Sequence, residues 1–137
     1  MTTTTGRGLA VTGPKLIYTD DEKHAYAFSG WLAVATGADT LLLDFTTNQH
    51  PTEITLYWGF NYDLLENGKY FGIDILLNGV RILRPRAEQR ISGSGHGTEL
   101  VDEIKFIIPP TTRCVINAQT DDGGTEAGCM IVGLVYG

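Results

Sequence analysis

Histidine is the side chain best suited to metal or acid–base chemistry near neutral pH, and this chain of 137 residues has three, His24, His50 and His96. Each lies in or beside a polar turn, far from the other two in the sequence. A metal site built from two histidines and a carboxylate on a β-sandwich needs two histidines close together on one strand, and no His-x-His occurs. We therefore expect ordinary surface histidines and no bound metal.

The carboxylates also lack the spacing that calcium binding or hydrolysis requires. The acidic turns Asp20-Asp21-Glu22 and Asp121-Asp122 do not alternate oxygen ligands or supply the distal glutamate of a calcium loop. A glycoside hydrolase needs two inward carboxylates about 5–9 Å apart. Asp44 and Asp74, the acids inside apolar strand-like runs, both fall on outward faces. We expect solvated turns and no hydrolase.

One serine-containing stretch superficially resembles the Gly-x-Ser-x-Gly motif of serine hydrolases: Ser92-Gly93-Ser94-Gly95-His96-Gly97. Its residue order is wrong, and no helix signal follows that would present a strained serine. The stretch is also too short and misplaced for a phosphate-binding loop. We expect a mobile loop here. Because no other catalytic or cofactor-binding set occurs, we predict a protein that is not an enzyme and needs no cofactor.

A cluster of arginines is the strongest charge feature. Arg81, Arg84, Arg86 and Arg90 supply four of the ten basic residues within ten positions. They form either a solvated strand end and loop, or a contact patch for an acidic protein surface, since the planar guanidinium binds carboxylates with two parallel hydrogen bonds. A nucleic-acid site is the third alternative, and the net charge of −6 disfavours it because phosphate binding needs a basic field.

The aromatic residues raise the possibility of a sugar-stacking platform. Trp58 and Phe60 share the inward period of Ile54 and Leu56, so we predict that they belong to the core. Tyr57 falls on the outward face and is the better candidate for an exposed aromatic at an interface or ligand site. The full set that could form a platform is Trp31, Tyr57, Trp58, Phe60, Tyr62 and Tyr70.

The elements that must position these residues are strands, because the apolar residues recur with a period of two almost everywhere and helix signals are scarce. Leu41, Leu43 and Phe45 are predicted to share one face of their strand. Asn78-Gly79 between two apolar runs predicts a type I′ hairpin. The expected strands are a short edge strand within 9–19, a long segment 24–36 broken by a bend at Ser29-Gly30, and 40–46, 53–61, 69–77, 80–83, 100–108, 113–119 and 127–136.

The last strand is apolar on both faces, with Cys129, Ile131 and Val135 on one and Val132 and Leu134 on the other. Such a strand should lie at the centre of its sheet or be covered by another subunit. The second cysteine is Cys114. We expect two reduced, buried thiols in preference to a disulfide, because the first residues, Met1-Thr2-Thr3-Thr4-Thr5-Gly6, do not have the basic-then-apolar pattern of an export signal.

About eight short strands separated by Gly, Pro and Asn turns predict an all-β fold. We favour an eight-stranded antiparallel jelly-roll sandwich over an immunoglobulin-like sandwich. The latter expects a Cys…Trp…Cys order, and here both tryptophans precede both cysteines. The length fits a single domain over 1–137, with 1–8 as a short flexible N-terminal arm. No apolar run of about 18 residues occurs, so no transmembrane helix is expected.

Five stretches, taken in order, resemble small virion proteins of tailed bacteriophages, the jelly-roll type that decorates or cements the outside of the capsid. They are Ala25-Tyr26-Ala27-Phe28-Ser29-Gly30, Thr40-Leu41-Leu42-Leu43-Asp44-Phe45-Thr46-Thr47, Ile75-Leu76-Leu77-Asn78-Gly79-Val80, Ile107-Ile108-Pro109-Pro110-Thr111-Thr112 and Gly133-Leu134-Val135-Tyr136-Gly137.

This resemblance implies a homotrimer that is made in the host cytoplasm and seated on the major capsid protein at the outer surface of the virion. It implies no enzyme activity and no cofactor, and no contact residue is carried over from it. Independently of the resemblance, the net charge of −6 and the lack of a long apolar run lead us to expect no nucleic-acid and no membrane partner. The alternative is a carbohydrate- or receptor-binding β-sandwich of a phage tail or fibre. A jelly-roll enzyme is a third interpretation, against which the missing His-x-His speaks.

Overall fold

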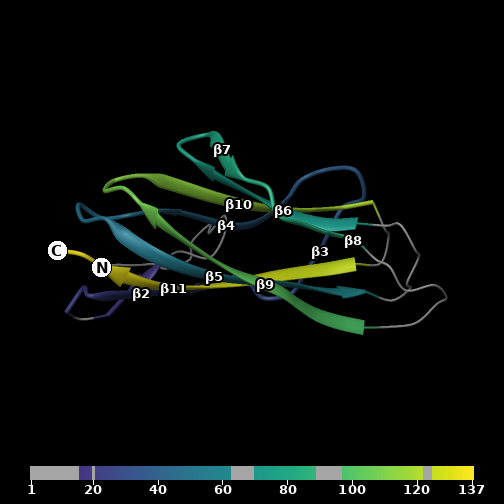
Figure 1. Cartoon of the computed structure of the whole chain (residues 1–137), viewed down its shortest axis with the longest axis horizontal. Coiled ribbons are helices and arrows are strands. Elements are labelled where there is room, and N and C mark those ends of the chain that lie inside the picture. The colour runs from purple at the N-terminus through teal and green to yellow at the C-terminus, as the bar shows by residue number, and fades with distance from the viewer. Residues whose placement is uncertain (1–15, 20, 63–69, 89–96, 122–124) are drawn as a thin grey trace, which may run out of the picture.

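The structure is a computed structural model that describes residues 16–19, 21–62, 70–88, 97–121 and 125–137. These residues form eleven strands in two antiparallel sheets stacked as a sandwich (Figure 1), which confirms the all-β prediction. The strands are β1 (Ile17–Tyr18), β2 (His24–Phe28), β3 (Leu32–Ala33), β4 (Thr40–Thr46), β5 (Thr52–Tyr62), β6 (Tyr70–Leu77), β7 (Val80–Leu83), β8 (Arg86–Glu88), β9 (Gly97–Ile108), β10 (Arg113–Thr120) and β11 (Thr125–Val135).

The strand order is that of a jelly roll. One sheet runs β1-β2-β11-β5-β9, with β3 also paired to β11, and the other runs β4-β10-β6-β7, with β8 also paired to β6. One expected strand, 24–36, is interrupted, and the sequence analysis did not predict β8, which continues the line of the expected strand 80–83. β2 and β3 both pair with β11 and are separated by the predicted bend at Ser29-Gly30, while β7 and β8 follow each other along β6. Counting each pair as one leaves eight positions, plus the short edge strand β1.

Turn chemistry explains the two-residue hairpin that the sequence predicted between two neighbouring strands of one sheet. Asn78 and Gly79 join β6 to β7 with φ angles of 48° and 82°. Both central residues of a type I′ turn need positive φ, and asparagine and glycine are the residues that tolerate it. The prediction of a type I′ hairpin is therefore confirmed.

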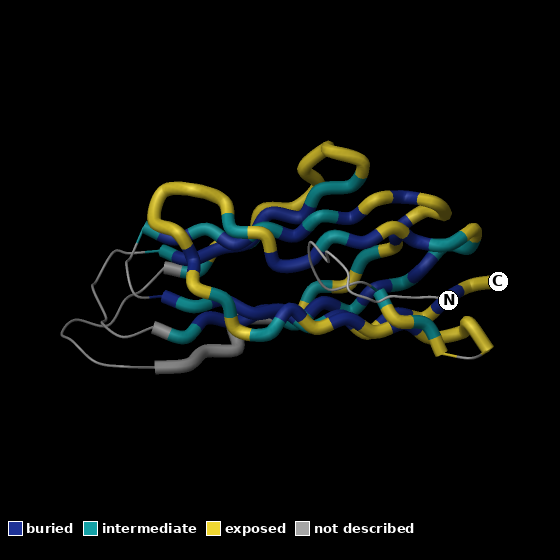
Figure 2. The backbone as a smooth tube through the Cα atoms, turned by 180° about the vertical axis from the view of Figure 1, so that it is seen from behind, coloured by how far each residue is buried: buried dark blue, intermediate teal, exposed yellow. Residues whose placement is uncertain are grey.

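The core lies between the two sheets, where the buried stretches of both layers face each other (Figure 2). Trp58 and Phe60 are 1% and 0% exposed, so their placement in the core is confirmed. Their rings meet edge to face with centroids 5.6 Å apart, and Phe60 stacks on Phe71 at 4.7 Å. These aromatic contacts tie β5 of one sheet to β6 of the other.

The prediction that Leu41, Leu43 and Phe45 share the inward face of β4 is wrong for Leu41. Leu41 is 37% exposed, whereas Leu42 is fully buried beside Leu43. The cause is a register shift in the β4–β10 pairing: Ile116 faces Leu43 while the next residue, Asn117, faces Leu41. Leu42 is thus the extra residue of a β-bulge, which changes the face on which the residues before it point.

The two cysteines are free and buried, as predicted. They come from opposite sheets, Cys114 from β10 and Cys129 from β11. Burial raises the pKa of each thiol to about 12, because a thiolate loses its hydration inside an apolar core. The predicted flexible arm over 1–8, Asp20 and Asp122 of the two acidic turns, and residues 92–96 of the predicted loop lie outside the described residues.

Candidate functional site

The predicted arginine cluster lies on the outer face of the β4-β10-β6-β7 sheet. β7 and β8 run along the same edge of β6, and the link between them contains Arg84 and Pro85. The Ile73 amide donates to the Pro85 carbonyl at 3.1 Å, which fixes this link to β6. The backbone therefore holds Arg84 and Arg86 above the outer surface of β6.

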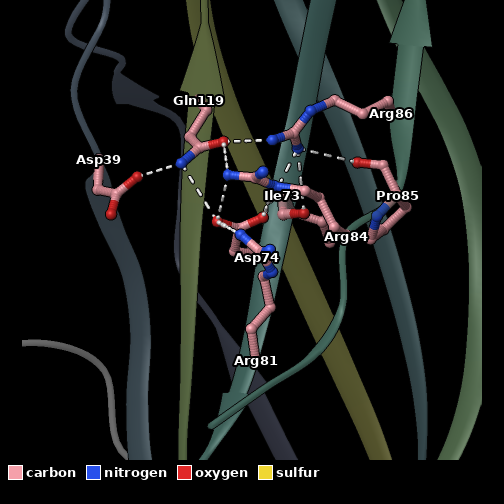
Figure 3. A network of polar contacts seen from close by, with 8 residues as sticks. All are labelled: Asp39, Ile73, Asp74, Arg81, Arg84, Pro85, Arg86 and Gln119. Atoms are coloured by element: carbon pink, nitrogen blue, oxygen red, sulfur yellow. Dashed lines mark hydrogen bonds and ion pairs between the residues drawn. The ribbon is translucent and has the colours of Figure 1, made fainter. Parts of the chain in front are cut away.

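Beneath these arginines is Asp74, which points away from the core, as predicted, but is only 5% exposed. Arg84 covers it with hydrogen bonds from Nε to Oδ1 at 2.9 Å and from Nη2 to Oδ2 at 3.4 Å. Nη1 of Arg86 lies 3.7 Å from Oδ1, and Nη1 of Arg81 lies 4.0 Å from Oδ2. Figure 3 shows three guanidinium groups converging on this one carboxylate.

Gln119 on β10 connects the network to a second carboxylate. Its Oε1 accepts hydrogen bonds from Nη2 of Arg84, at 3.4 Å, and from Nη2 of Arg86. Its Nε2 donates to Oδ2 of Asp74 at 3.2 Å and to Oδ1 of Asp39 (Figure 3). The side-chain oxygen of Gln119 thus accepts from two arginines, and its side-chain nitrogen donates to two aspartates. These bonds fix the orientation of both guanidiniums.

Arg86 is held more tightly than the other two arginines. Its Nη1 donates to the carbonyls of Ile73 and Pro85 at 3.5 and 3.4 Å, and its Cζ lies 5.4 Å from the centre of the Tyr70 ring, within cation–π range. Desolvation, and then the positive charge of Arg84, lower the pKa of Arg86 below its usual range. The nearby carboxylate of Asp74 acts in the opposite direction and favours the charged guanidinium.

Three residues that shape this site were missed by the sequence analysis: Gln119, Asp39 and Gly72. A Cβ at Gly72 would lie 2.6 Å from Cδ of Arg86 and 2.7 Å from the Pro85 carbonyl. Glycine is thus needed so that Arg86 can lie flat on β6. A glycine directly inside an apolar strand was the available signal for such a close approach.

A cavity of about 360 Å³ opens beside the two guanidiniums. We call it the arginine pocket. Its walls come from the β3–β4 loop, the start of β6, the link into β8 and the end of β10. The lining residues are Gly37, Ala38, Asp39, Tyr70, Arg84, Arg86, Gln119 and Thr120.

The structure brings together three of the five predicted contact residues: Arg81, Arg84 and Arg86. Arg90 lies outside the described residues. Tyr57 lies on β5 in the other sheet, so it is not part of the same site. It is half-buried, between Met130 of β11 and Glu103 of β9. The role of all five residues in partner binding stays a prediction.

Tyr57 belongs to a second surface, the outer face of the β1-β2-β11-β5-β9 sheet. β11 is central in that sheet, as predicted, yet its outward side chains are not covered: Val132 is 44% and Leu134 39% exposed. Register places Phe28, Met130 and Tyr57 in one row across the strands. We call this the apolar face, made of Ile17, Tyr26, Phe28, Tyr57, Met130, Val132 and Leu134.

The described part of the chain holds no group of three or more His, Cys, Asp or Glu side chains arranged to bind a metal ion. Over the same residues no helix has the length and apolarity to cross a membrane.

A comparison with models of protein families found no match, and neither did a search of curated protein sequences. Among solved structures, the fold is similar to a chain in the structure of infectious bursal disease virus, Gx strain, with a TM-score of 0.52 and 15% identity over 84% of this chain and 33% of that one. Dimeric latent PorU from Porphyromonas gingivalis gives a TM-score of 0.47 and 9% identity over 90% of this chain and 12% of that one. This chain thus spans a third or less of those two, and the viral likeness shows a shared fold.

Proposed function

We propose that this protein is a structural component of a phage virion, a decoration or cement protein that binds the outer surface of the assembled lattice of major capsid proteins. The observation that carries the proposal is the uncovered apolar face on a jelly-roll sandwich. The resemblance of the five sequence stretches to capsid decoration proteins supports it, and so does a fold shared with a chain of a virus structure. In this role the protein catalyses no reaction and needs no cofactor.

The size of the apolar face fits a protein interface. Five of its side chains are 39–63% exposed: Ile17, Tyr26, Phe28, Val132 and Leu134. Since large side chains bury about 150–250 Å² each, such a set offers on the order of 400–500 Å² of apolar area. A standard interface takes about 800 Å² from each partner, of which roughly 57–65% is non-polar. The face therefore approaches the apolar content of one side of a stable interface.

The partners we propose for this protein are a second and third copy of the same chain, and the capsid lattice. In a homotrimer the apolar face would be covered between subunits. A trimer that touches several lattice sites at once gains avidity without strong single contacts. Because it binds the assembled shell and not the free capsid subunits, it stabilises the assembled form by mass action. After synthesis in the host cytoplasm it would reside on the outer surface of the virion.

The test uses purified protein and expanded capsids that lack it. We expect light scattering to give the mass of a trimer and the protein to co-sediment with capsids. Val132→Lys should shift the mass toward monomer, whereas Val80→Lys is the matched control, since Val80 is 65% exposed on the hairpin of the other sheet. A purely monomeric wild-type protein that does not co-sediment would refute the proposal.

The arginine cluster enters the same test. Replacing Arg84 and Arg86 with glutamate should lower capsid occupancy. It should also lower the unfolding temperature, because the buried carboxylate of Asp74 loses its paired cations, so occupancy is measured at a temperature at which circular dichroism shows that the variant is folded. Capsid occupancy equal to that of the wild type would show that this part of the surface does not face the lattice.

A carbohydrate- or receptor-binding module is the alternative, and one observation favours it. Tyr26, Phe28 and Trp31 are 43–48% exposed. Tyr26 and Phe28 lie on β2, and Trp31, in the link between β2 and β3, lies beside Gly128 of the neighbouring strand β11. Against it, the neighbours of these rings include Val132 and Met130, which offer sugar hydroxyls no hydrogen-bond partner. A glycan array on which the wild type binds and Trp31→Ala does not would favour this alternative; no binding to any glycan would contradict it.

A further inference from the structure

We propose that the arginine pocket is a receptor for a carboxylate, supplied by an acidic side chain of a partner polypeptide. The inference rests on the proposed function for the identity of that polypeptide, a capsid protein. The binding of a carboxylate as such stands on the geometry of the pocket alone.

The first argument is charge balance. Among the described side chains, the network of Figure 3 sets three guanidiniums against two carboxylates, Asp74 and Asp39. Elsewhere on the same sheet face Arg113 places Nε at 2.9 Å and Nη2 at 2.7 Å from the two oxygens of Asp44. Both hydrogen-bonding edges of Arg113 that face Asp44 are thus occupied. The network of Figure 3 as a whole has one positive charge in excess, because Arg81, at its edge outside the pocket lining, shares Asp74 with the other two arginines, and an anion bound in the neighbouring pocket would neutralise that charge.

The second argument is preorganisation. Arg84 is fixed by Asp74 and Gln119, and Arg86 by Gln119 and the Pro85 carbonyl. Their side chains are nevertheless 44% and 29% exposed, so part of each guanidinium faces the pocket. Because these guanidiniums are already held in position, binding an anion restricts their side chains little further. Loss of side-chain entropy is a main cost of an ordinary surface salt bridge, so this cost is small here.

The third argument concerns the kind of anion. The flat fork of arginine matches a carboxylate, and the cavity of about 360 Å³ accepts a glutamate or aspartate side chain. Asp39 at the rim repels a doubly charged phosphate more strongly than a carboxylate, and it can accept a backbone N–H from the polypeptide that brings the acid. The negative charge of the whole chain further disfavours nucleic acid.

The experiment is a titration of the full-length protein with an acetylated, amidated tetraglutamate peptide at low ionic strength, followed by NMR of the Gln119 side-chain amide and the arginine Nε–H groups. We expect saturable shifts at Gln119 and Arg84. Arg84→Gln should weaken binding roughly tenfold, the usual effect of removing one charge-assisted hydrogen-bonding partner. Asp39→Asn should tighten it, because it removes the like charge at the rim.

Arg113→Gln is the matched control, since it removes the same charge from the same sheet face and lies on β10, six residues from Gln119. It should leave the affinity almost unchanged. Thermal unfolding of each variant shows whether the fold is kept, and if Arg84→Gln does not fold, Arg84→Lys retains the charge, loses the fork and should still weaken binding.

Three results would overturn the inference: no saturable shift at Gln119, equal weakening by Arg113→Gln, or tighter binding of glucuronate or inorganic phosphate than of the peptide. The proposed function fails separately. Peptide binding without capsid binding would refute the capsid role and leave the receptor in place, whereas capsid binding without any peptide effect at Gln119 would refute the receptor alone.

Discussion

Replacing Trp58 with phenylalanine should change the free energy of unfolding by less than about 1 kcal/mol, although Trp58 is among the largest buried side chains. The reason is a conflict inside the core. The ring is 1% exposed and packs edge to face on Phe60, but its Nε1–H is buried without a hydrogen-bond partner among the described residues. Phenylalanine keeps most of the packing and removes the unpaired donor.

The two opposing contributions are similar in size. Shortening the indole to a phenyl ring removes about three heavy atoms, and at about 24 cal/mol per Å³ of cavity plus the lost transfer energy this costs roughly 1–2 kcal/mol. Removing a buried donor that has no hydrogen-bond partner stabilises the folded state by about 1–3 kcal/mol. Trp58→Ala removes the packing as well, so it should lose about 3–5 kcal/mol in spite of the same gain.

The assay is urea unfolding followed by far-UV circular dichroism, because Trp31 would complicate fluorescence. Phe60→Leu is the control, since Phe60 is equally buried and has no polar atom; it should lose about 1–2 kcal/mol. If Trp58→Phe lowers the free energy of unfolding by more than Phe60→Leu does, the indole N–H has a hydrogen-bond partner in solution and this reasoning is wrong. A negligible loss in Trp58→Ala would mean that the ring is not part of the core.

Three further predictions follow from local geometry. Cys114 and Cys129 should resist Ellman's reagent at pH 8 in the native protein and react after unfolding in guanidinium; because burial raises each pKa from 9.0 to about 12, stability should also fall as pH rises from 9 toward 12. Gly79→Ala should lower the free energy of unfolding, measured in urea, by about 1–2 kcal/mol, since the φ angle of 82° at this position strains any residue with a Cβ. Arg113→Gln should cost less than about 1 kcal/mol, because its ion pair with Asp44 is largely exposed, and the difference from wild type should shrink in 1 M salt.

Much of the fold could be predicted from the sequence because its determinants are local. Alternation of apolar residues placed Trp58 and Phe60 in the core, and the Asn78-Gly79 pair determined both the position and the type of a hairpin. The doubly apolar last strand correctly indicated a central position for β11. Each of these signals acts over a few residues, where steric and hydrophobic preferences are strong enough to dominate.

What could not be predicted depends on which strands become neighbours. The bulge that turns Leu41 outward is visible only in the pairing of β4 with β10. In the same way, Asp74, Gln119 and Asp39 are separated by up to 80 positions in the chain and meet only because β10 lies between β4 and β6. The sequence identified the arginines of the site, but the partners that hold them in position are non-local.

The distribution of the two surfaces bears on the proposed role. In a sandwich of two sheets, the outer faces point in opposite directions, and here they differ in chemistry. One carries the apolar face and the other the arginine pocket together with the exposed Arg113–Asp44 pair. In the proposed trimer the apolar faces pack against neighbouring subunits, which leaves the arginine-bearing face of each subunit free to meet acidic groups of the lattice. Several modest contacts of this kind make one strong attachment, since each further contact forms at the high effective concentration set by the first.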